Sequence, residues 1–599
     1  MMLTLPATRA TRPRQPIRWL RTTLTVLFLL ATALGSLALF GSGGGDDSHI
    51  TWWVVDELRR TGHFHNFNGV ALEQSSSLAL VLIAALFRYL VPVATPALGV
   101  GLSILAMAGT SWMTGRLASR LDLRLRFPAM LLVASSGPLV YWSTSGMETA
   151  LAAFANVWLL DAVGQCLSRL PVAMTAGRIR QTCVAIIPAS ALFVSVRPEN
   201  PLLLVGTLVG GLLCWAILLF AGRAKYDPNA FRHVQLIGAC ALLPAVALFL
   251  WRHWVFREWF PHPVTAKGSG GARWRHGWEY LLRHTTDFQP TMLLLPIAIG
   301  VVLVAVWCHR AKAINLGLAV FATLGVAFIC ASGGDWMSCG RFLAPQLPVW
   351  WLTVLIALSV CLRRSLIWLR ASVAVLALAN GWFLFGLARS GGTNGYPLNA
   401  ALKVVPAAKA QYALDGYPFI ELANKSHLRD ALLSEELKRV VEQVRRENPD
   451  KIWLASGQAG AVPYHVFRAF PDQLRFIDFW GLTSSEAIPC IPQSKLKHSS
   501  LGVAASPELM FEYRDAIWRD CHVPQADIVF NTGLRSGTKK GLEARGYRVV
   551  YFQRGAMPSF AEPGLLRGGT SMDAYIAVRR ELADKLHLRY REVRWSLAG

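Results

Sequence analysis

Two adjacent aspartates, Asp46 and Asp47, follow the first long apolar run of the chain. One carboxylate of such a pair can take a proton from a hydroxyl group while its neighbour orients it or holds a cation. A polar helix cap is the structural alternative, because aspartate is a favoured N-cap residue. His49, His63 and His65 follow, but their spacing is not diagnostic of a metal site. The sequence therefore requires no metal ion, although a divalent cation is compatible with it.

Six further charged residues lie between apolar runs, five of them close to the end of a run and one, Lys267, within a longer loop. Charged side chains at membrane depth are costly and are usually functional. The cations of this set could bind a phosphate, and the carboxylates could align those cations. A helix start with an acid in its first turn, a simple ion pair or an exposed charge is the alternative in each case. The six residues are Glu148, Arg197, Glu199, Lys267, Asp335 and Arg341.

The composition indicates that membrane-spanning helices position these residues. Hydrophobic residues make up 53% of the 599 residues and charged residues only 16%, whereas soluble proteins carry about 25% charged residues. These values exclude a soluble, disordered, collagen-like or small disulfide-rich protein. The net charge of +24 would suggest nucleic acid in a soluble protein. Inner loops of membrane proteins collect Lys and Arg, so we expect no nucleic-acid partner, and outer-side cations suit an anionic lipid-linked substrate.

Eleven apolar runs predict eleven membrane spans. The segment before the first run is rich in arginine and has no acid, which favours an uncleaved first helix with its N-terminus inside over a cleaved signal peptide. The predicted spans lie near residues 22–40, 96–115, 128–145, 149–166, 183–196, 201–220, 236–255, 291–308, 314–331, 346–362 and 371–388.

A further apolar run at residues 78–92 is interrupted by Arg88. If this run does not cross the membrane, every inner loop is basic, as the positive-inside rule requires. If it does cross, all of those loops move to the outer side. We therefore expect an outer juxtamembrane or re-entrant helix here. The basic inner loops are then 116–127, 167–181, 221–235, 309–313 and 363–370.

The composition changes near residue 390, where charged residues become frequent and spanning runs end. A charged amphipathic pattern predicts a helix over 428–447, and short β-type runs alternate with helical stretches, which is typical of a small α/β domain. We therefore expect a transmembrane domain at 1–389 and an extracytoplasmic domain at 390–599. Cys490 and Cys521 are its two cysteines, either as a disulfide or as two thiols.

Several motifs of the chain, taken in order, resemble those of GT-C glycosyltransferases, specifically the terminal arabinofuranosyltransferase-like branch of cell-wall enzymes. Each motif alone is weak, but their order and their shared side of the membrane make the set more specific. The motifs are 46–50 (DDSHI), 73–77 (EQSSS), 146–149 (GMET), 197–199 (RPE), 261–267 (PHPVTAK), 333–337 (GGDWM), 341–343 (RFL), 457–460 (GQAG) and 478–483 (DFWGLT).

The resemblance implies a multi-helix GT-C fold with outer juxtamembrane helices and a C-terminal soluble domain in a bacterial inner membrane. It implies transfer of a sugar, D-arabinofuranose in this branch, from a polyprenyl-phosphate donor to a glycan or a protein such as pilin. The catalytic residue would be Asp46 or Asp47, and the donor phosphate would meet Arg197, Lys267 and Arg341. The residues expected to orient sugar or acceptor are His49, Glu73, Glu148, Glu199 and Asp335.

One departure concerns the acceptor side. The family often has Tyr-Thr-Ser-Pro-Leu-Trp after the glutamate of the first loop, whereas this chain has Gln-Ser-Ser-Ser-Leu-Ala at 74–79. The sugar and the acceptor are therefore open. A transporter or flippase of a lipid-linked sugar is the main alternative, although transporters often have inverted repeats and midplane polar residues, which we do not find. A non-catalytic assembly factor is the third hypothesis for the function.

Overall fold

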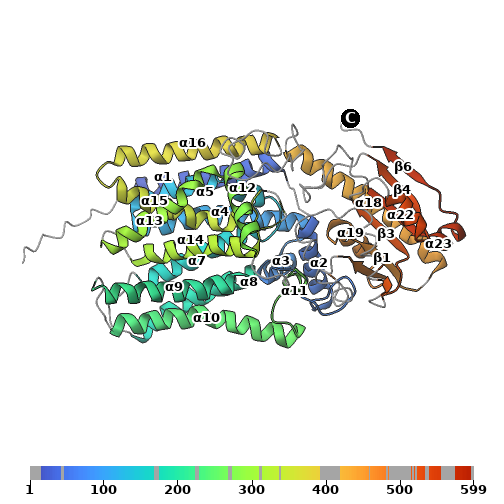
Figure 1. Cartoon of the computed structure of the whole chain (residues 1–599), viewed down its shortest axis with the longest axis horizontal. Coiled ribbons are helices and arrows are strands. Elements are labelled where there is room, and N and C mark those ends of the chain that lie inside the picture. Colours follow the sequence, from blue (N-terminus) through green and yellow to red (C-terminus); the bar gives the residue numbers. More distant parts are fainter. Residues whose placement is uncertain are drawn as a thin grey trace, which may run out of the picture.

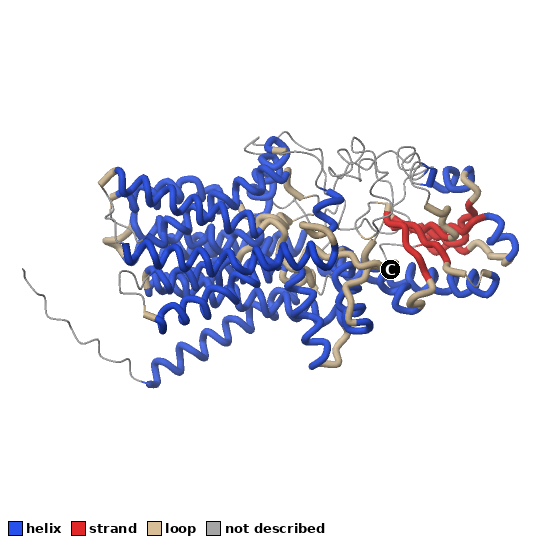
Figure 2. The backbone as a smooth tube through the Cα atoms, turned by 90° about the horizontal axis from the view of Figure 1, so that it is seen from below, coloured by secondary structure: helices blue, strands red, loops and turns tan. Residues whose placement is uncertain are grey.

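The computed structural model consists of a long helical bundle with a mixed α/β domain at one end (Figure 1). Figure 2 shows the strands confined to that end and helices in the rest. Cys490 and Cys521 lie outside the described residues. The structure describes residues 15–41, 46–167, 175–222, 228–267, 273–308, 313–335, 337, 339–390, 419–448, 450–457, 459–479, 483, 515, 518–519, 523–532, 538–554 and 574–594.

Ten helical segments among the described residues are long and apolar enough to cross a membrane. Their positions agree with ten of the eleven predicted spans. The segments are α1 (Gln15–Phe40), α4 (Thr95–Leu121), α7 (Thr149–Leu167), α8 (Ala176–Val196), α9 (Asn200–Phe220), α10 (Pro228–Phe256), η2 with α13 (Pro290–Leu294, Leu295–Trp307), α14 (Ala313–Ser332), η3 with α15 (Ala344–Gln346, Leu347–Cys361) and α16 (Leu366–Ser390).

The predicted span at 128–145 is not one helix. It consists of α5 (Arg126–Ala134) and α6 (Gly137–Trp142), with Pro138 in the first turn of α6. Proline cannot donate the backbone hydrogen bond that would continue α5. The N–H of Gly137 instead donates to Oε1 of Gln289 at 3.2 Å. Together the two helices still connect the bundle end that contains Asp161 to the end that contains Glu148.

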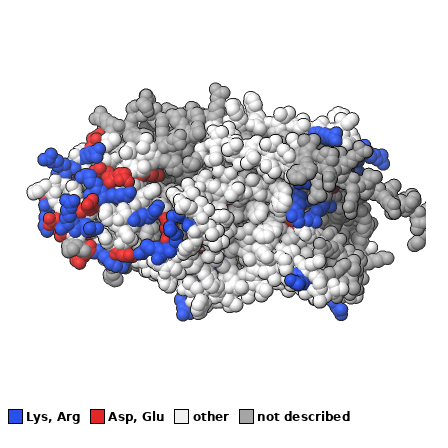
Figure 3. Space-filling view, turned by 180° about the vertical axis from the view of Figure 1, so that it is seen from behind, with Lys and Arg blue, Asp and Glu red and all other residues white. Residues whose placement is uncertain are grey.

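The two ends of the bundle differ in charge. At the end away from the α/β domain, Arg120 and Arg116 of α4 both pair with Asp161 of α7, at 2.5 and 3.3 Å. Figure 3 shows mostly Lys and Arg at that end, a broad belt without charges, and mixed charges on the α/β domain. An uncharged belt is the surface that a bilayer requires.

The α/β domain is built on a six-stranded mixed sheet with the order β2-β1-β3-β5-β4-β6. β1 is parallel to both β2 and β3, whereas β5 is antiparallel to β3 and β4. The long amphipathic helix α18 (Phe419–Glu447) covers the predicted 428–447. The other elements are β1 (Ile452–Ser456), α19 (Ala461–Ala469), β2 (Leu474–Asp478), β3 (Ile528–Thr532), α22 (Thr538–Ala544), β4 (Tyr547–Arg554), β5 (Ala574–Arg579), α23 (Arg580–Lys585) and β6 (Arg591–Arg594).

Four shorter helices lie at the end of the bundle that faces the α/β domain. α2 (Asp46–Thr61), α3 (Leu78–Leu90) and α11 (His262–Lys267) lie near the domain in Figure 1, and α12 (Trp274–Phe288) packs against α14. α3 covers the run at 78–92 and is shorter than the ten candidate spans. Apolar side chains of α2 and α3 share one core with α18, α19 and the sheet. The α/β domain therefore packs directly on the helix that begins with Asp46 and Asp47.

Candidate functional site

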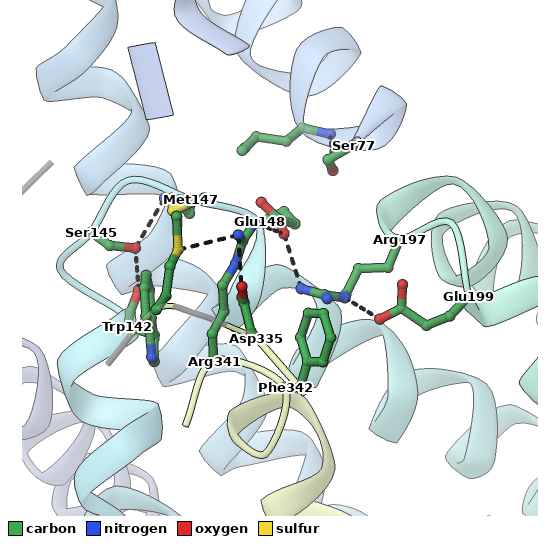
Figure 4. A network of polar contacts seen from close by, with 12 residues as sticks. Ser77, Trp142, Ser145, Met147, Glu148, Arg197, Glu199, Asp335, Arg341 and Phe342 are labelled. Carbon is green, nitrogen blue, oxygen red and sulfur yellow. Dashed lines mark hydrogen bonds and ion pairs between the residues drawn. The ribbon is translucent and has the colours of Figure 1, made fainter. Parts of the chain in front are cut away.

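Glu148 is the centre of a buried charged cluster at this end of the bundle (Figure 4). It directly precedes α7 and is 3% exposed. Its Oε1 accepts hydrogen bonds from Nη1 of Arg197 at 3.0 Å and from Nη2 of Arg341 at 2.9 Å. Burial alone raises the pKa of Glu148, but the two guanidinium groups outweigh it and lower the pKa. The carboxyl group is therefore ionised at neutral pH.

Arg197 follows the last residue of α8 because Pro198 comes next and disfavours a helical backbone before it. Its Nε donates to the carboxylate of Glu199, while its guanidinium carbon lies 5.0 Å from the centre of the Phe342 ring. Figure 4 shows Arg197 between Glu148 and Glu199. Two carboxylates and one aromatic ring therefore fix the plane of this cation.

Arg341 lies on the loop 333–343, between α14 and η3. Its Nη1 is 3.6 Å from Oδ2 of Asp335 and 3.3 Å from Sδ of Met337. Two buried atoms here, Asp335 Oδ2 and Arg341 Nε, make no hydrogen bond in the described part of the chain. An unsatisfied buried polar group costs about 1–3 kcal/mol, so a ligand that pairs with these two atoms would recover that cost.

α12 supports the loop that contains Arg341. The ring of Tyr280 fills the space where a side chain at Gly334 would point, since a Cβ there would lie 2.3 Å from Tyr280 Cγ. The Tyr280 hydroxyl accepts from the N–H of Phe342 at 3.2 Å, and Nδ1 of His284 accepts from the N–H of Gly340 at 3.1 Å. Burial lowers the pKa of His284 to about 3, so the ring is neutral and can accept.

α2 brings Asp47 to the same cluster. Trp52 of α2 packs where Cβ atoms on Gly99 and Gly146 would lie, at 2.0 and 3.1 Å from its ring. Only residues without a side chain permit this approach, and Gly146 also has a φ of +69°. Asp47 is half-buried and lies near enough to Arg341 to raise its pKa. The backbone of Asp46 begins α2, while its side chain is outside the described residues.

Burial by itself lowers the pKa of Arg341, but three carboxylates outweigh it and raise the pKa overall. They belong to Glu148, Asp335 and Asp47. Each carboxylate comes from a different segment: the start of α2, the start of α7 and the loop 333–343. The structure therefore brings together charged groups from separate parts of the sequence, and Asp47 is among them.

Two expected site residues, Glu73 and His49, contact other groups, and the side chain of a third is not described. Glu73 forms a bidentate ion pair with Arg252 of α10, at 2.8 and 3.0 Å, rather than joining Arg197 and Arg341. His49 packs its ring against Tyr464 and His465 of the α/β domain, at centroid distances of 5.3 and 5.7 Å. Lys267 ends α11, and its side chain lies outside the described residues.

Sequence reasoning missed Arg252, Tyr280 and His284. Arg252 is 1% exposed and lies near the end of an apolar run. A charged residue within such a run indicates a paired or functional side chain, so the sequence could have identified it. Tyr280 and His284 gave no comparable signal. They act through contacts with the backbone of the loop 333–343, and such contacts leave no motif in the sequence.

The cluster holds more carboxylates than cations. Arg197 and Arg341 face Asp47, Glu148, Glu199 and Asp335. No three His, Cys, Asp or Glu side chains within the described ranges converge as a metal site would require. The arrangement provides a half-buried carboxylate that can accept a proton, two oriented guanidinium groups and one unsatisfied carboxylate oxygen. Such a set suits proton transfer from a hydroxyl beside an anionic leaving group.

No family model and no curated protein sequence matches this chain. The solved structures that are similar in fold include the following two. The structure of ArnT from Cupriavidus metallidurans in the apo state aligns with a TM-score of 0.52 at 14% identity, over 95% of this chain and 99% of that one. The archaeal oligosaccharyltransferase AglB from Archaeoglobus fulgidus, in complex with an inhibitory peptide and a dolichol-phosphate, aligns with a TM-score of 0.52 at 12% identity, over 86% and 70%. The chain therefore has the polytopic GT-C fold with a C-terminal sheet domain.

Proposed function

We propose that this chain is a glycosyltransferase that uses a polyprenyl-phosphate sugar as its donor. The observation that carries the proposal is the convergence of Asp47, Glu148, Arg197 and Arg341 at one end of a membrane bundle. The fold likeness to AglB, whose structure contains a dolichol-phosphate and a peptide, supports a lipid-linked donor.

The chemistry assigned to these groups is a single displacement. The acceptor hydroxyl oxygen forms a bond to the anomeric carbon as the bond from that carbon to the phosphate oxygen breaks. The hydroxyl proton passes to Asp47 or Asp46, and the polyprenyl phosphate departs with the electron pair. A base in this position contributes about 10²–10⁴-fold to a rate.

Arg341 and Arg197 are the candidates for the departing phosphate, together with Lys267. The unsatisfied Nε of Arg341 can donate to a phosphate oxygen without breaking its bond to Glu148. Oδ2 of Asp335 can accept from a sugar hydroxyl. Glu148 and Glu199 then orient the two cations, which keeps the charge of the site fixed before the phosphate leaves.

The finer assignments rest on the motif resemblance. The sugar proposed is D-arabinofuranose, and the acceptor is a glycan or a protein such as pilin. His49 and Glu73 were expected to orient sugar or acceptor; their contacts with Tyr464 and Arg252 favour a supporting role in this site.

The proposed topology puts the basic end of the bundle in the cytoplasm of a bacterium, in line with the positive-inside rule. The site and the α/β domain then lie on the periplasmic side of the inner membrane. Residues 1–389 would form the transmembrane catalytic domain and residues 390–599 the extracytoplasmic domain.

The decisive experiment compares Asp46→Asn, Asp47→Asn and the double variant in nanodiscs with polyprenyl-phosphoryl arabinofuranose. We expect at least one single variant to lose about 100-fold or more of transfer. The matched control is Asp122→Asn, which removes an Arg124 partner at the opposite end of the bundle and should transfer normally. Full transfer by the double variant would refute the catalytic assignment. Movement of labelled lipid without a glycosidic product would favour a flippase.

A further inference from the structure

α2 and α19 pack side by side and run in the same direction. Contacts near the start of α2 reach the start of α19, and contacts near its end reach the residues after α19. The N-terminus of α19 therefore lies at the same end of the pair as the two aspartates. The contacts are His49 with Tyr464, Trp53 with Phe467, and Arg60 with Asp472.

Asp56 is the polar junction of this packing. The hydroxyl of Tyr464 donates to Oδ2 of Asp56 at 2.8 Å. Arg468 donates from Nη1 to the same hydroxyl at 3.0 Å, and its Nε lies 3.4 Å from Asp56 Oδ2. On the other side, Thr95 donates to Oδ1 of Asp56, and Arg88 donates to Thr95 at 3.0 Å. One carboxylate therefore links α2 to α3, α4 and α19.

A shift of Asp56 would also move Asp47, because both residues belong to one continuous helix, α2. Asp56 lies nine residues after Asp47, which corresponds to about 13 Å along a helix. The ring of Tyr464 is fully buried, so its hydroxyl can exchange Asp56 for water only if α2 and α19 separate. A displacement of about 1 Å can cost about 100-fold in rate when reacting groups must be aligned.

We propose that Tyr464 and Arg468 of the α/β domain are positioning residues for glycosyl transfer, and that they act by holding Asp56 and thereby the N-terminal turn of α2. The α/β domain then helps to fix the geometry of the active site, and docking is not its only role. The catalytic half of this inference rests on the proposed function; the structural half, that the contact fixes α2, does not.

The test uses Tyr464→Phe in the full-length protein, because this change removes only the hydroxyl and keeps the ring against His49. We expect kcat to fall about tenfold while KM for the donor stays within about twofold. If the change only reduced the amount of folded protein, the fraction of active molecules would fall, while kcat per active molecule would stay the same. Amide exchange of residues 46–56 should become faster, while exchange in α14 and α15 stays the same. Asp56→Asn should reproduce both effects.

The matched control is Asp472→Asn, which removes the ion pair between Arg60 of α2 and a residue that follows α19, at the end of α2 away from Asp47. Asp472 has a φ of 64°, a conformation that asparagine also adopts, so we expect unchanged kcat and unchanged exchange at 46–56. Wild-type exchange in Tyr464→Phe would overturn the proposal, as would an equal loss of kcat in Asp472→Asn. If the wild-type protein transfers no sugar, the proposed function fails, while the exchange result still decides whether Tyr464 holds α2.

Discussion

At the scale of single residues, Glu148 shows how one carboxylate can organise two cations. A single oxygen accepts from Arg197 and Arg341, and all three side chains are less than a tenth exposed. Removing one partner of such a buried group typically costs about 3–5 kcal/mol, because the charges left behind cannot return to water. We therefore expect Glu148→Gln to lower the free energy of unfolding by about that amount and to abolish transfer, as measured by thermal unfolding and by product formation.

The pH dependence of this effect follows from the lowered pKa of Glu148. A carboxyl group whose pKa is lower in the folded protein than in the unfolded chain stabilises the fold at every pH above its unfolded-state pKa. This contribution is lost as the pH falls through the pKa of the folded state. The difference between wild type and Glu148→Gln should stay constant from pH 6 to 8 and shrink in acid. Glu279→Gln removes only an exposed partner of Arg275 and should change stability by less than about 1 kcal/mol. Equal effects of both variants would contradict the assigned role of Glu148.

Asp287 of α12 should behave in the opposite way. It is 6% exposed, and burial raises its pKa from 3.8 to about 6 against the opposing effect of Arg283. The folded protein thus binds this proton more tightly than the unfolded chain. Stability from this group is complete below about pH 4 and is lost as the pH rises through 6.

Asp287→Asn should therefore raise the free energy of unfolding at pH 7.5, by at most about 3 kcal/mol, and change it little at pH 4. Unfolding in detergent at the two pH values measures this difference. Asp584→Asn, at an exposed position paired with Arg548, serves as the control and should show no such pH dependence. The prediction would be contradicted if the difference in the free energy of unfolding, Asp287→Asn minus wild type, were smaller at pH 7.5 than at pH 4.

The sequence could place charged residues at the ends of apolar runs, but it could not pair them. Expecting Glu148 and Arg341 at one membrane face required only hydropathy and the positive-inside rule. Helix packing determines which cation each carboxylate pairs with. Glu73 shows this limit, because its partner Arg252 lies far along the chain and inside a predicted span.

At the scale of elements, the loop 333–343 depends on α12 for its shape. Gly334 has a φ of +79°, and Tyr280 occupies the space of its absent side chain. Gly334→Ala must therefore displace Tyr280, and with it the bond to the N–H of Phe342. We expect a loss of stability of about 2–4 kcal/mol and a large loss of transfer, since backbone strain and overpacking add.

Gly62→Ala is the matched control for Gly334→Ala. Gly62 has nearly the same φ, +77°, but nothing lies within 4 Å of its Cβ position. This change should cost only the backbone strain, about 1–2 kcal/mol, and should leave transfer unchanged. A similar result for both variants would show that Tyr280 does not determine the shape of the loop.

The predicted elements were reliable where hydropathy alone decides. Ten spans agree with the structure because each contains a long window of high mean hydropathy, and the helix over 428–447 follows from its 3.6-residue pattern. The span at 128–145 was wrong as a single helix. Pro138 breaks it, and the freed N–H of Gly137 pairs with Gln289, a residue that sequence reasoning could not connect to this segment.

At the scale of the whole molecule, the charge asymmetry of the bundle predicts which side of the membrane the site faces. The uncharged belt separates an end with mostly Lys and Arg from the end that contains Glu148 (Figure 3). Exposed tryptophans also lie near the Glu148 end, at Trp259, Trp274 and Trp278, where aromatic side chains favour a membrane–water interface. The lipid-linked donor and the α/β domain would then meet at that interface.

Native cysteines allow this orientation to be tested without rebuilding the protein. Cys308 and Cys361 are exposed at the helix ends that precede the basic loops 309–313 and 363–370. If those loops are cytoplasmic, a membrane-impermeant maleimide should not modify either cysteine in intact cells and should modify both in inverted vesicles, as read by mass spectrometry of the tryptic peptides. Arg275→Cys, at an exposed position of α12 on the other side, should show the reverse pattern. Modification of Cys308 and Cys361 in intact cells would place the Glu148 cluster in the cytoplasm, where transfer onto an outer-surface acceptor could not take place.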